Sequence, residues 1–180
     1  MRLFAERFRA RNQLMQQAVE DRLRYEHLQK ELAIAEQIQA SMLPRDFSLG
    51  PGVDVVAEMS AARHVGGDFY DVFKLNDDEF CVAVGDVAGK GIPAALFVVK
   101  AMTILRTEMM KQQPVDRALA ALNRALCKGN ERCMFVTIAV VAIDTVTGDC
   151  RYVSAGHNPA ALMVSPGPGA TPGEPANRLT

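Results

Sequence analysis

The 180-residue chain lacks three features that would assign it to a common class. Its formal net charge of −1 gives no general reason to expect nucleic acid or an anionic membrane as a partner. Its longest uninterrupted apolar run, Ile92 to Val99, is far shorter than the roughly 18–20 residues of a membrane span. Arg and Glu interrupt the N-terminal segment throughout, which predicts that no signal peptide is present. We therefore expect no membrane span in this chain and no nucleic-acid partner.

The cysteines also lack a pattern, because no two of them form a CxxC pair. Cys81 lies inside an apolar strand pattern, and free cysteine is usually a small buried hydrophobe. The spacing of the four cysteines predicts no disulfide framework, and we therefore expect a reducing cytoplasm. These cysteines are Cys81, Cys127, Cys133 and Cys150. The location is thus expected to be cytoplasmic, while a sensor region upstream of this chain could tether the parent protein to a membrane.

The first 43 residues contain neither Gly nor Pro and are rich in helix-forming residues, whereas the remainder changes period. The sequence therefore predicts a helical linker over 1–43 and a globular domain over 44–180. A 4-3 spacing of mostly apolar residues predicts a coiled-coil seam and a parallel homodimer. The alternative is an amphipathic helix that lies on its own domain. The seam residues are Leu14, Ala18, Asp21, Tyr25, Leu28, Leu32, Ala35, Gln39 and Met42.

The chain as a whole is 49% hydrophobic, and this apolar content excludes a disordered chain. Strand patterns and helix patterns follow one another along the globular part. A polar turn at 76–78 joins two of the strands and predicts an antiparallel hairpin, whose second strand ends at Gly85 and Asp86. This order predicts an α+β fold with helices packed on mainly antiparallel sheets. Strands are predicted at 53–59, 68–73, 80–84, 134–143, 150–153 and 161–164, and helices at 92–111 and 114–127.

Two acidic residues beside glycines are the candidate functional residues: Asp68 in Val-Gly-Gly-Asp-Phe-Tyr-Asp and Asp86 in Gly-Asp-Val-Ala-Gly-Lys-Gly. Hairpin strands can bring the two carboxylates together, and clustered carboxylates must take up a proton or a cation. Oxygen ligands without a His/Cys set favour Mg²⁺ or Mn²⁺. Arg63 lies just upstream and could hold a phosphate. The alternative is that both motifs are Asp-Gly turns with solvated carboxylates.

Two known sequence signatures, the P-loop and GGDEF, match these glycine-rich segments only in part. Only three residues separate Gly85 from Gly89, and Gly91 stands where a P-loop needs Ser or Thr, which disfavours a nucleotide-binding domain. The run Gly66-Gly67-Asp68 is similar to the GGDEF signature of diguanylate cyclases, but the following Glu and Phe are absent.

Five motifs in order carry a more specific signal, and over roughly 28–165 the chain resembles the bacterial PPM (PP2C-like) protein phosphatases of the SpoIIE/RsbU type. The first motif runs from 31 to 39 and leads to Met42-Leu43-Pro44. The others lie at 63–71, 85–95, 134–137 and 155–159.

The resemblance implies an α-β-β-α sandwich with two metal ions, Mn²⁺ or Mg²⁺, at one end of its sheets. It implies hydrolysis of phosphoserine or phosphothreonine on a partner such as a STAS-domain anti-sigma-factor antagonist. Matched by position, Asp86 would bridge both ions, the carbonyl of Val87 would be a further ligand, and Asp68 would bind one ion. Arg63 would contact the phosphate, so Asp68, Asp86 and Arg63 are the expected catalytic residues.

The chain also departs from this family. Ala88 stands where many relatives have a His, and no later Asp-Gly motif or last acidic ligand follows. We therefore expect a C-terminally truncated, incomplete sandwich, and the alternative function is a catalytically incomplete dimerisation or interaction module. His157 could approach the substrate, or it could be a turn residue that hydrogen-bonds the backbone.

Overall fold

The computed structural model describes residues 2–45, 47, 49, 53–59 and 65–161. The chain divides into two compact units, Met1–Met42 and Leu43–Thr180. The expected residue Arg63 and nearly all of the strand expected at 161–164 lie outside the described residues.

The first unit is one long helix, α1, from Arg2 to Met42, as the absence of Gly and Pro predicts. Pro44 follows it and cannot continue a helix. Several large apolar side chains of α1 are exposed, including Leu14, Tyr25 and Leu28 on the expected seam. Apolar side chains off the seam, such as Val19 and Leu23, are exposed as well, so α1 has more than one apolar line along it.

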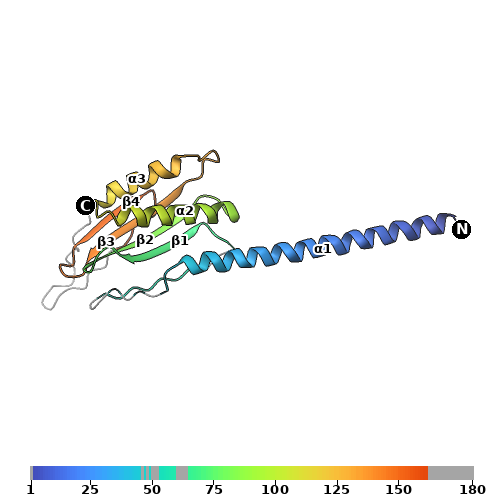
Figure 1. The fold of residues 1–180 in the computed structure, drawn as a ribbon, viewed down its shortest axis with the longest axis horizontal. Coiled ribbons are helices and arrows are strands. Elements are labelled where there is room, and N and C mark those ends of the chain that lie inside the picture. Colours follow the sequence, from blue (N-terminus) through green and yellow to red (C-terminus); the bar gives the residue numbers. More distant parts are fainter. Residues whose placement is uncertain (1, 46, 48, 50–52, 60–64, 162–180) are drawn as a thin grey trace. The chain divides into compact units, whose positions relative to one another are not determined.

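The second unit contains one antiparallel sheet in the order β1-β2-β3-β4 (Figure 1). Its strands are β1 (Asp68–Lys74), β2 (Glu79–Val87), β3 (Val136–Asp144) and β4 (Cys150–Ala155). The hairpin predicted from the polar turn is confirmed as the β1–β2 pair. The predicted end of its second strand at Gly85 and Asp86 is wrong, because β2 continues to Val87, where its ladder with β3 closes at Val136.

Helices α2 (Ile92–Met109) and α3 (Val115–Cys127) cover one face of this sheet (Figure 1). Pro93 occupies the first turn of α2, where its missing N–H costs no intrahelical bond. Alternate residues of the strands point at the helices, so that Cys81, Ala83 and Val140 join Val98 and Leu105 in the main core. Cys81 is fully buried, as predicted.

The opposite face of the sheet carries a smaller core of Leu49, Val72 and Phe80, with Phe47, Val53 and Val55 packed on it. The strand predicted at 53–59 is wrong, because these residues form no regular structure. Their alternating burial matches a strand, yet they pair with none of the four strands of the sheet. Alternating apolar and polar residues therefore show that one side of a segment faces a core, but they do not show that its backbone pairs with a strand.

Candidate functional site

Asp68 and Asp86 stand directly opposite each other at one end of the β1–β2 hairpin. Because side chains alternate along a strand, directly opposed residues point to the same face of the sheet. Here that face is the one turned away from α2 and α3, since Phe69 and Val87 point into the helix-side core. Both aspartates are exposed. The fold thus brings together the two carboxylates that the motifs single out.

The two carboxylates share one patch of negative charge. Partial burial raises the pKa of Asp68 above its ordinary value, and the charge and hydrogen bond of Asp86 raise it further. The nearby His157 acts in the opposite direction and lowers the pKa of Asp68. A positive charge that binds between Asp68 and Asp86 is therefore stabilised by both carboxylates.

The glycines beside the aspartates serve packing rather than ligand approach. A Cβ on Gly67 would lie 2.5 Å from the carbonyl oxygen of Val87, whose own N–H donates to the carbonyl of Gly67 at 3.0 Å. A Cβ on Gly85 would lie 2.5 Å from the ring of Phe69. Both glycines allow β1 and β2 to close tightly beside Asp68 and Asp86.

Thr137 and His157 extend this end of the sheet on the other side of Asp86. Thr137 is the β3 residue opposite Asp86, and its hydroxyl donates to the carbonyl oxygen of Asp86 at 3.4 Å. The same hydroxyl oxygen lies 2.9 Å from Nδ1 of His157. Thr137 therefore links the backbone of β2 at Asp86 to the imidazole ring of His157.

His157 therefore differs from the turn residue that the sequence suggested, because its ring bonds a side chain and not the backbone. Only its carbonyl oxygen takes part in the turn, accepting from the Ser154 hydroxyl at 3.1 Å. Thr137 was missed as a neighbour of the site, although strand alternation from Asp86 across the sheet could have found it once the β2–β3 register was known.

The chemical type of the available ligand atoms suits a hard divalent cation. Two carboxylates and the carbonyl of Val87, which follows Asp86 directly, are all oxygen donors of the sort that Mg²⁺ and Mn²⁺ prefer. Among the residues that the structure describes, no group of three His, Cys, Asp or Glu side chains is close enough to hold a metal ion.

Sequence reasoning also missed an ion pair on the helix side of the sheet, between a buried carboxylate and a partly exposed arginine. Asp71 has no exposed surface, and Arg106 of α2 donates to it from Nε at 2.6 Å and from Nη2 at 2.5 Å. The signal was present in the alternation of β1, which places Asp71 between Phe69 and Phe73 on the buried face. A carboxylate at such a position requires a charged partner.

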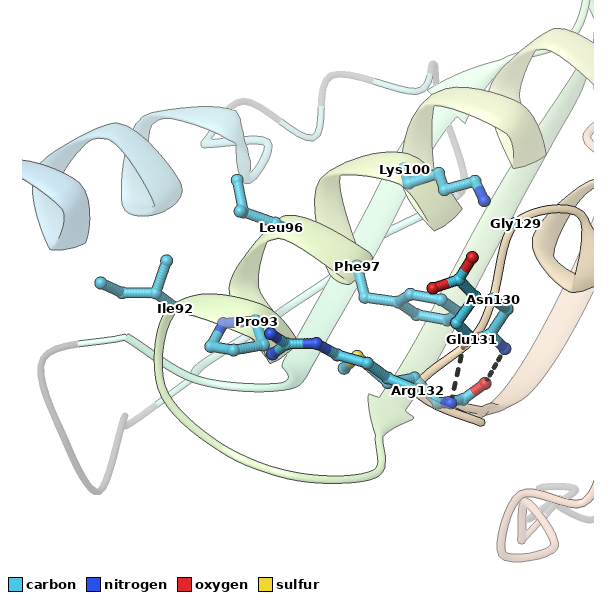
Figure 2. Close-up of a pocket in the computed structure, with 10 residues that line it drawn as sticks. Ile92, Pro93, Leu96, Phe97, Lys100, Gly129, Asn130, Glu131 and Arg132 are labelled. Carbon is cyan, nitrogen blue, oxygen red and sulfur yellow. Dashed lines mark hydrogen bonds between the residues drawn. The ribbon is translucent and has the colours of Figure 1, made fainter.

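A cavity of about 600 Å³ lies beside the start of α2 (Figure 2). Ile92, Leu96 and Phe97 form its apolar side, and the loop at 129–132 forms its polar side. Two hydrogen bonds between Asn130 and the backbone of Met134 hold that loop. No helix in the described part of the chain has the length and apolar content of a membrane span.

Comparison with known proteins gives three findings. The family described as Stage II sporulation protein E (SpoIIE) matches residues 76–178. Protein IcfG of Synechocystis sp. is 29% identical over 165 residues, which are 76% of this chain and 26% of IcfG. Phosphoserine phosphatase RsbU of Bacillus subtilis is 27% identical over 136 residues, which are 74% of this chain and 40% of RsbU.

A solved structure supports the fold. The SiaA-PP2C domain of Pseudomonas aeruginosa matches with a TM-score of 0.56 and 23% identity, over 67% of this chain and 50% of that chain. The described helices and sheet are therefore part of a PP2C-like fold, as the resemblance implied. The chain itself spans well under half the length of the curated relatives that it matches.

Proposed function

The chain belongs to the SpoIIE family, and from this premise we propose that it is the metal-dependent serine/threonine phosphatase domain of a bacterial signalling protein. The observation that carries the proposal is the opposition of Asp68 and Asp86 at one end of the sheet. Burial and the charge of Asp86 together raise the pKa of Asp68, and a cation that binds between the two carboxylates relieves their repulsion.

The proposed roles of the residues follow from their positions and from the family resemblance. Asp86 would bridge two ions, Mn²⁺ or Mg²⁺, with Asp68 on one of them and the carbonyl of Val87 as a further ligand. Divalent cations supply a water of lowered pKa and neutralise charge on the phosphoryl oxygens. Arg63 would bind the phosphate, since a guanidinium matches two phosphate oxygens at once.

The proposed substrate is a regulatory protein phosphorylated on serine or threonine, such as a STAS-domain anti-sigma-factor antagonist. The similarity to a protein named phosphoserine phosphatase supports the phosphoserine part of this proposal. A cytoplasmic location is consistent with the four free thiols, Cys81, Cys127, Cys133 and Cys150.

Phosphate release from a phosphoserine STAS-domain protein tests the proposal. We expect any release to require Mn²⁺ and to be absent with EDTA or in the Asp86→Asn variant, because removing either the ions or their bridging ligand removes the water activation. Isothermal titration with Mn²⁺ is run beside the assay. Saturable Mn²⁺ binding without any phosphate release would instead support the catalytically incomplete interaction module.

We further propose that α1 forms a parallel homodimer. Leu14, Tyr25 and Leu28 are 66%, 63% and 49% exposed, and burying such side chains is worth roughly 1.5–3 kcal/mol each. Asp21 lies on the same stripe and weakens the seam.

Analytical ultracentrifugation at tens of micromolar, with and without residues 1–27, tests the dimer. We expect the whole chain to sediment as a dimer and the shortened chain as a monomer, since the shortened chain loses Leu14 and Tyr25 of the seam. A monomer in both cases would contradict the proposal, and a dimer in both would move the interface to another surface.

A further inference from the structure

The Asp71–Arg106 pair is an unusual way to attach a helix to a sheet. Asp71 is completely buried, and it receives both of its hydrogen bonds from one guanidinium in a two-pronged arrangement. The Arg106 guanidinium also lies over the ring of Phe73, 5.3 Å from its centre. The hydrogen bond with Asp71 raises the pKa of Arg106, so the guanidinium stays charged.

Stability alone does not require this pair. The completely buried carboxylate of Asp71 carries a desolvation penalty, whereas the Arg106 side chain remains 44% exposed. Apolar side chains of similar volume often stabilise a core as well as a buried charged group does. Apolar packing positions a helix through the shapes of its side chains, and it contains no directional bond. Two parallel hydrogen bonds fix both distance and angle, and they therefore select one position of α2 on β1.

The position of α2 matters because it is connected to both strands of the acidic site. Its first residue, Ile92, follows Val87 of β2 after a short loop that contains two glycines with positive φ, Gly89 and Gly91. Near its other end, Arg106 reaches β1 at Asp71, three residues after Asp68. Figure 1 shows α2 lying over these two strands.

The strand β1 depends on such an anchor more than its neighbours do. In the described sheet it is an edge strand, bonded along one side only, to β2. Asp71 faces the helices while Asp68 faces the opposite side, so the ion pair holds the strand without occupying the acidic site.

We propose that Asp71 and Arg106 are positioning residues that hold Asp68 opposite Asp86 by fixing α2 on β1. This inference rests on the proposed function for its catalytic meaning, whereas the placement of Asp68 can be tested without turnover. Groups that hydrogen-bond a metal ligand change the metal affinity about 10–100-fold when they are lost. Asp71 and Arg106 act on Asp68 only through the backbone of β1, so we take the lower end of that range for them.

The test uses three variants of the whole chain. Arg106→Lys keeps the charge and loses the two-pronged geometry, and the double variant Asp71→Leu/Arg106→Met replaces the pair by apolar side chains. Lys111→Met is the control, because it removes the exposed Glu108–Lys111 ion pair, 2.7 Å long, just beyond the same end of α2. Thermal unfolding, amide NMR spectra and Mn²⁺ titration are measured for each.

The double variant is expected to unfold near the temperature of the parent chain, while its amide signals at Asp68 and Gly85–Val87 shift or broaden. Its Mn²⁺ affinity is expected to fall about tenfold or more, and Arg106→Lys is expected to do the same. In a phosphatase assay the loss would appear in kcat, with KM little changed. Lys111→Met is expected to leave all of these unchanged.

Two results would overturn the inference. A stable double variant with unchanged signals at Asp68 and unchanged Mn²⁺ affinity would make the pair a purely structural contact, as would a double variant that does not fold. Failure of the proposed function is distinguishable, because it would appear as an absence of Mn²⁺ binding in the parent chain, where the amide signals still report the position of Asp68.

Discussion

Both ends of the sheet are acidic, but only one of them leaves its carboxylates facing each other. At the far end, Glu79 of β2 is the register partner of Asp144 of β3. There Glu79 pairs with Arg151, and Asp144 accepts two backbone N–H groups of the following turn, each at 2.8 Å. At the near end, the register partners are Asp68 and Asp86, and the neighbour of each is the other carboxylate.

The pKa values of the two ends move in opposite directions for this reason. Hydrogen bonds from the N–H groups of Thr147 and Val146 lower the pKa of Asp144, whereas burial and Asp86 raise the pKa of Asp68. The same residue type is thus a turn residue at one end and a candidate cation ligand at the other. What separates a site from a solvated turn is whether the fold itself neutralises the charge.

The largest expected effect is the loss of activity in Asp86→Asn. A ligand to both ions should matter more than a ligand to one, so Asp86→Asn is expected to lower kcat/KM by at least about 100-fold, and Asp68→Asn by less. Asp77→Asn is the matched control, because Asp77 lies in the turn of the same hairpin at the far end. Steady-state hydrolysis of a phosphoserine substrate with Mn²⁺ measures all three.

Equal and mild losses in Asp68→Asn and Asp86→Asn would contradict the assignment of Asp86 as the bridging ligand. A loss in Asp77→Asn as large as theirs would remove the contrast between the two ends, since the effect would then follow the charge of the hairpin and not the site.

The hairpin that makes this contrast could be predicted from sequence, because β1 and β2 are apolar, alternating and joined by a short polar turn. The pairing of Asp68 with Asp86 follows once the hairpin is centred on that turn. The position of Asp86 inside β2 could not be predicted, since the strand is extended by its ladder with β3, which is distant in sequence.

Other parts of the site depend on packing that no local pattern contains. The partner of Asp71 lies 35 residues away on α2, so the sequence could indicate the need for a cation without naming Arg106. The bond between His157 and Thr137 likewise depends on how β3 and the residues after β4 return to the sheet. At 53–59 the sequence predicted a strand that the structure does not have, because residues buried on one side of an irregular segment alternate as they do in a strand.

Glycine substitutions are expected to have a smaller effect, on the free energy of unfolding. The cause differs between the two ends of the sheet, a steric clash at one and backbone strain at the other. Gly67→Ala places a Cβ 2.5 Å from the backbone carbonyl of Val87, and it is expected to lower the free energy of unfolding by about 3 kcal/mol. Gly148→Ala at the far end meets no atom within 4 Å, but φ is +77°, which costs about 1 kcal/mol. Urea unfolding measures both, and equal losses would contradict the tight closure of β1 on Val87.

The smallest expected effect is in the titration of the two ends, followed by carboxyl ¹³C NMR. Asp68 should titrate above its ordinary pKa of 3.8 and Asp144 below it. For Asp68, the folded chain binds the proton more tightly than the unfolded chain. Its contribution to the free energy of unfolding therefore falls as the pH rises through the raised pKa, and the cost persists at neutral pH. For Asp144, the stabilisation is present above pH 3.8 and is lost as the pH falls through the lowered pKa.

The variant Asp86→Asn sharpens this last comparison. It should move the pKa of Asp68 downward but not fully to 3.8, because burial, the largest cause, remains when the charge of Asp86 is removed. The pKa of Asp144 should stay where it is, since its hydrogen bonds lie at the other end of the sheet. An Asp68 that titrates at or below Asp144, or that does not respond to Asp86→Asn, would mean that the two carboxylates do not share the charge on which the proposed cation site depends.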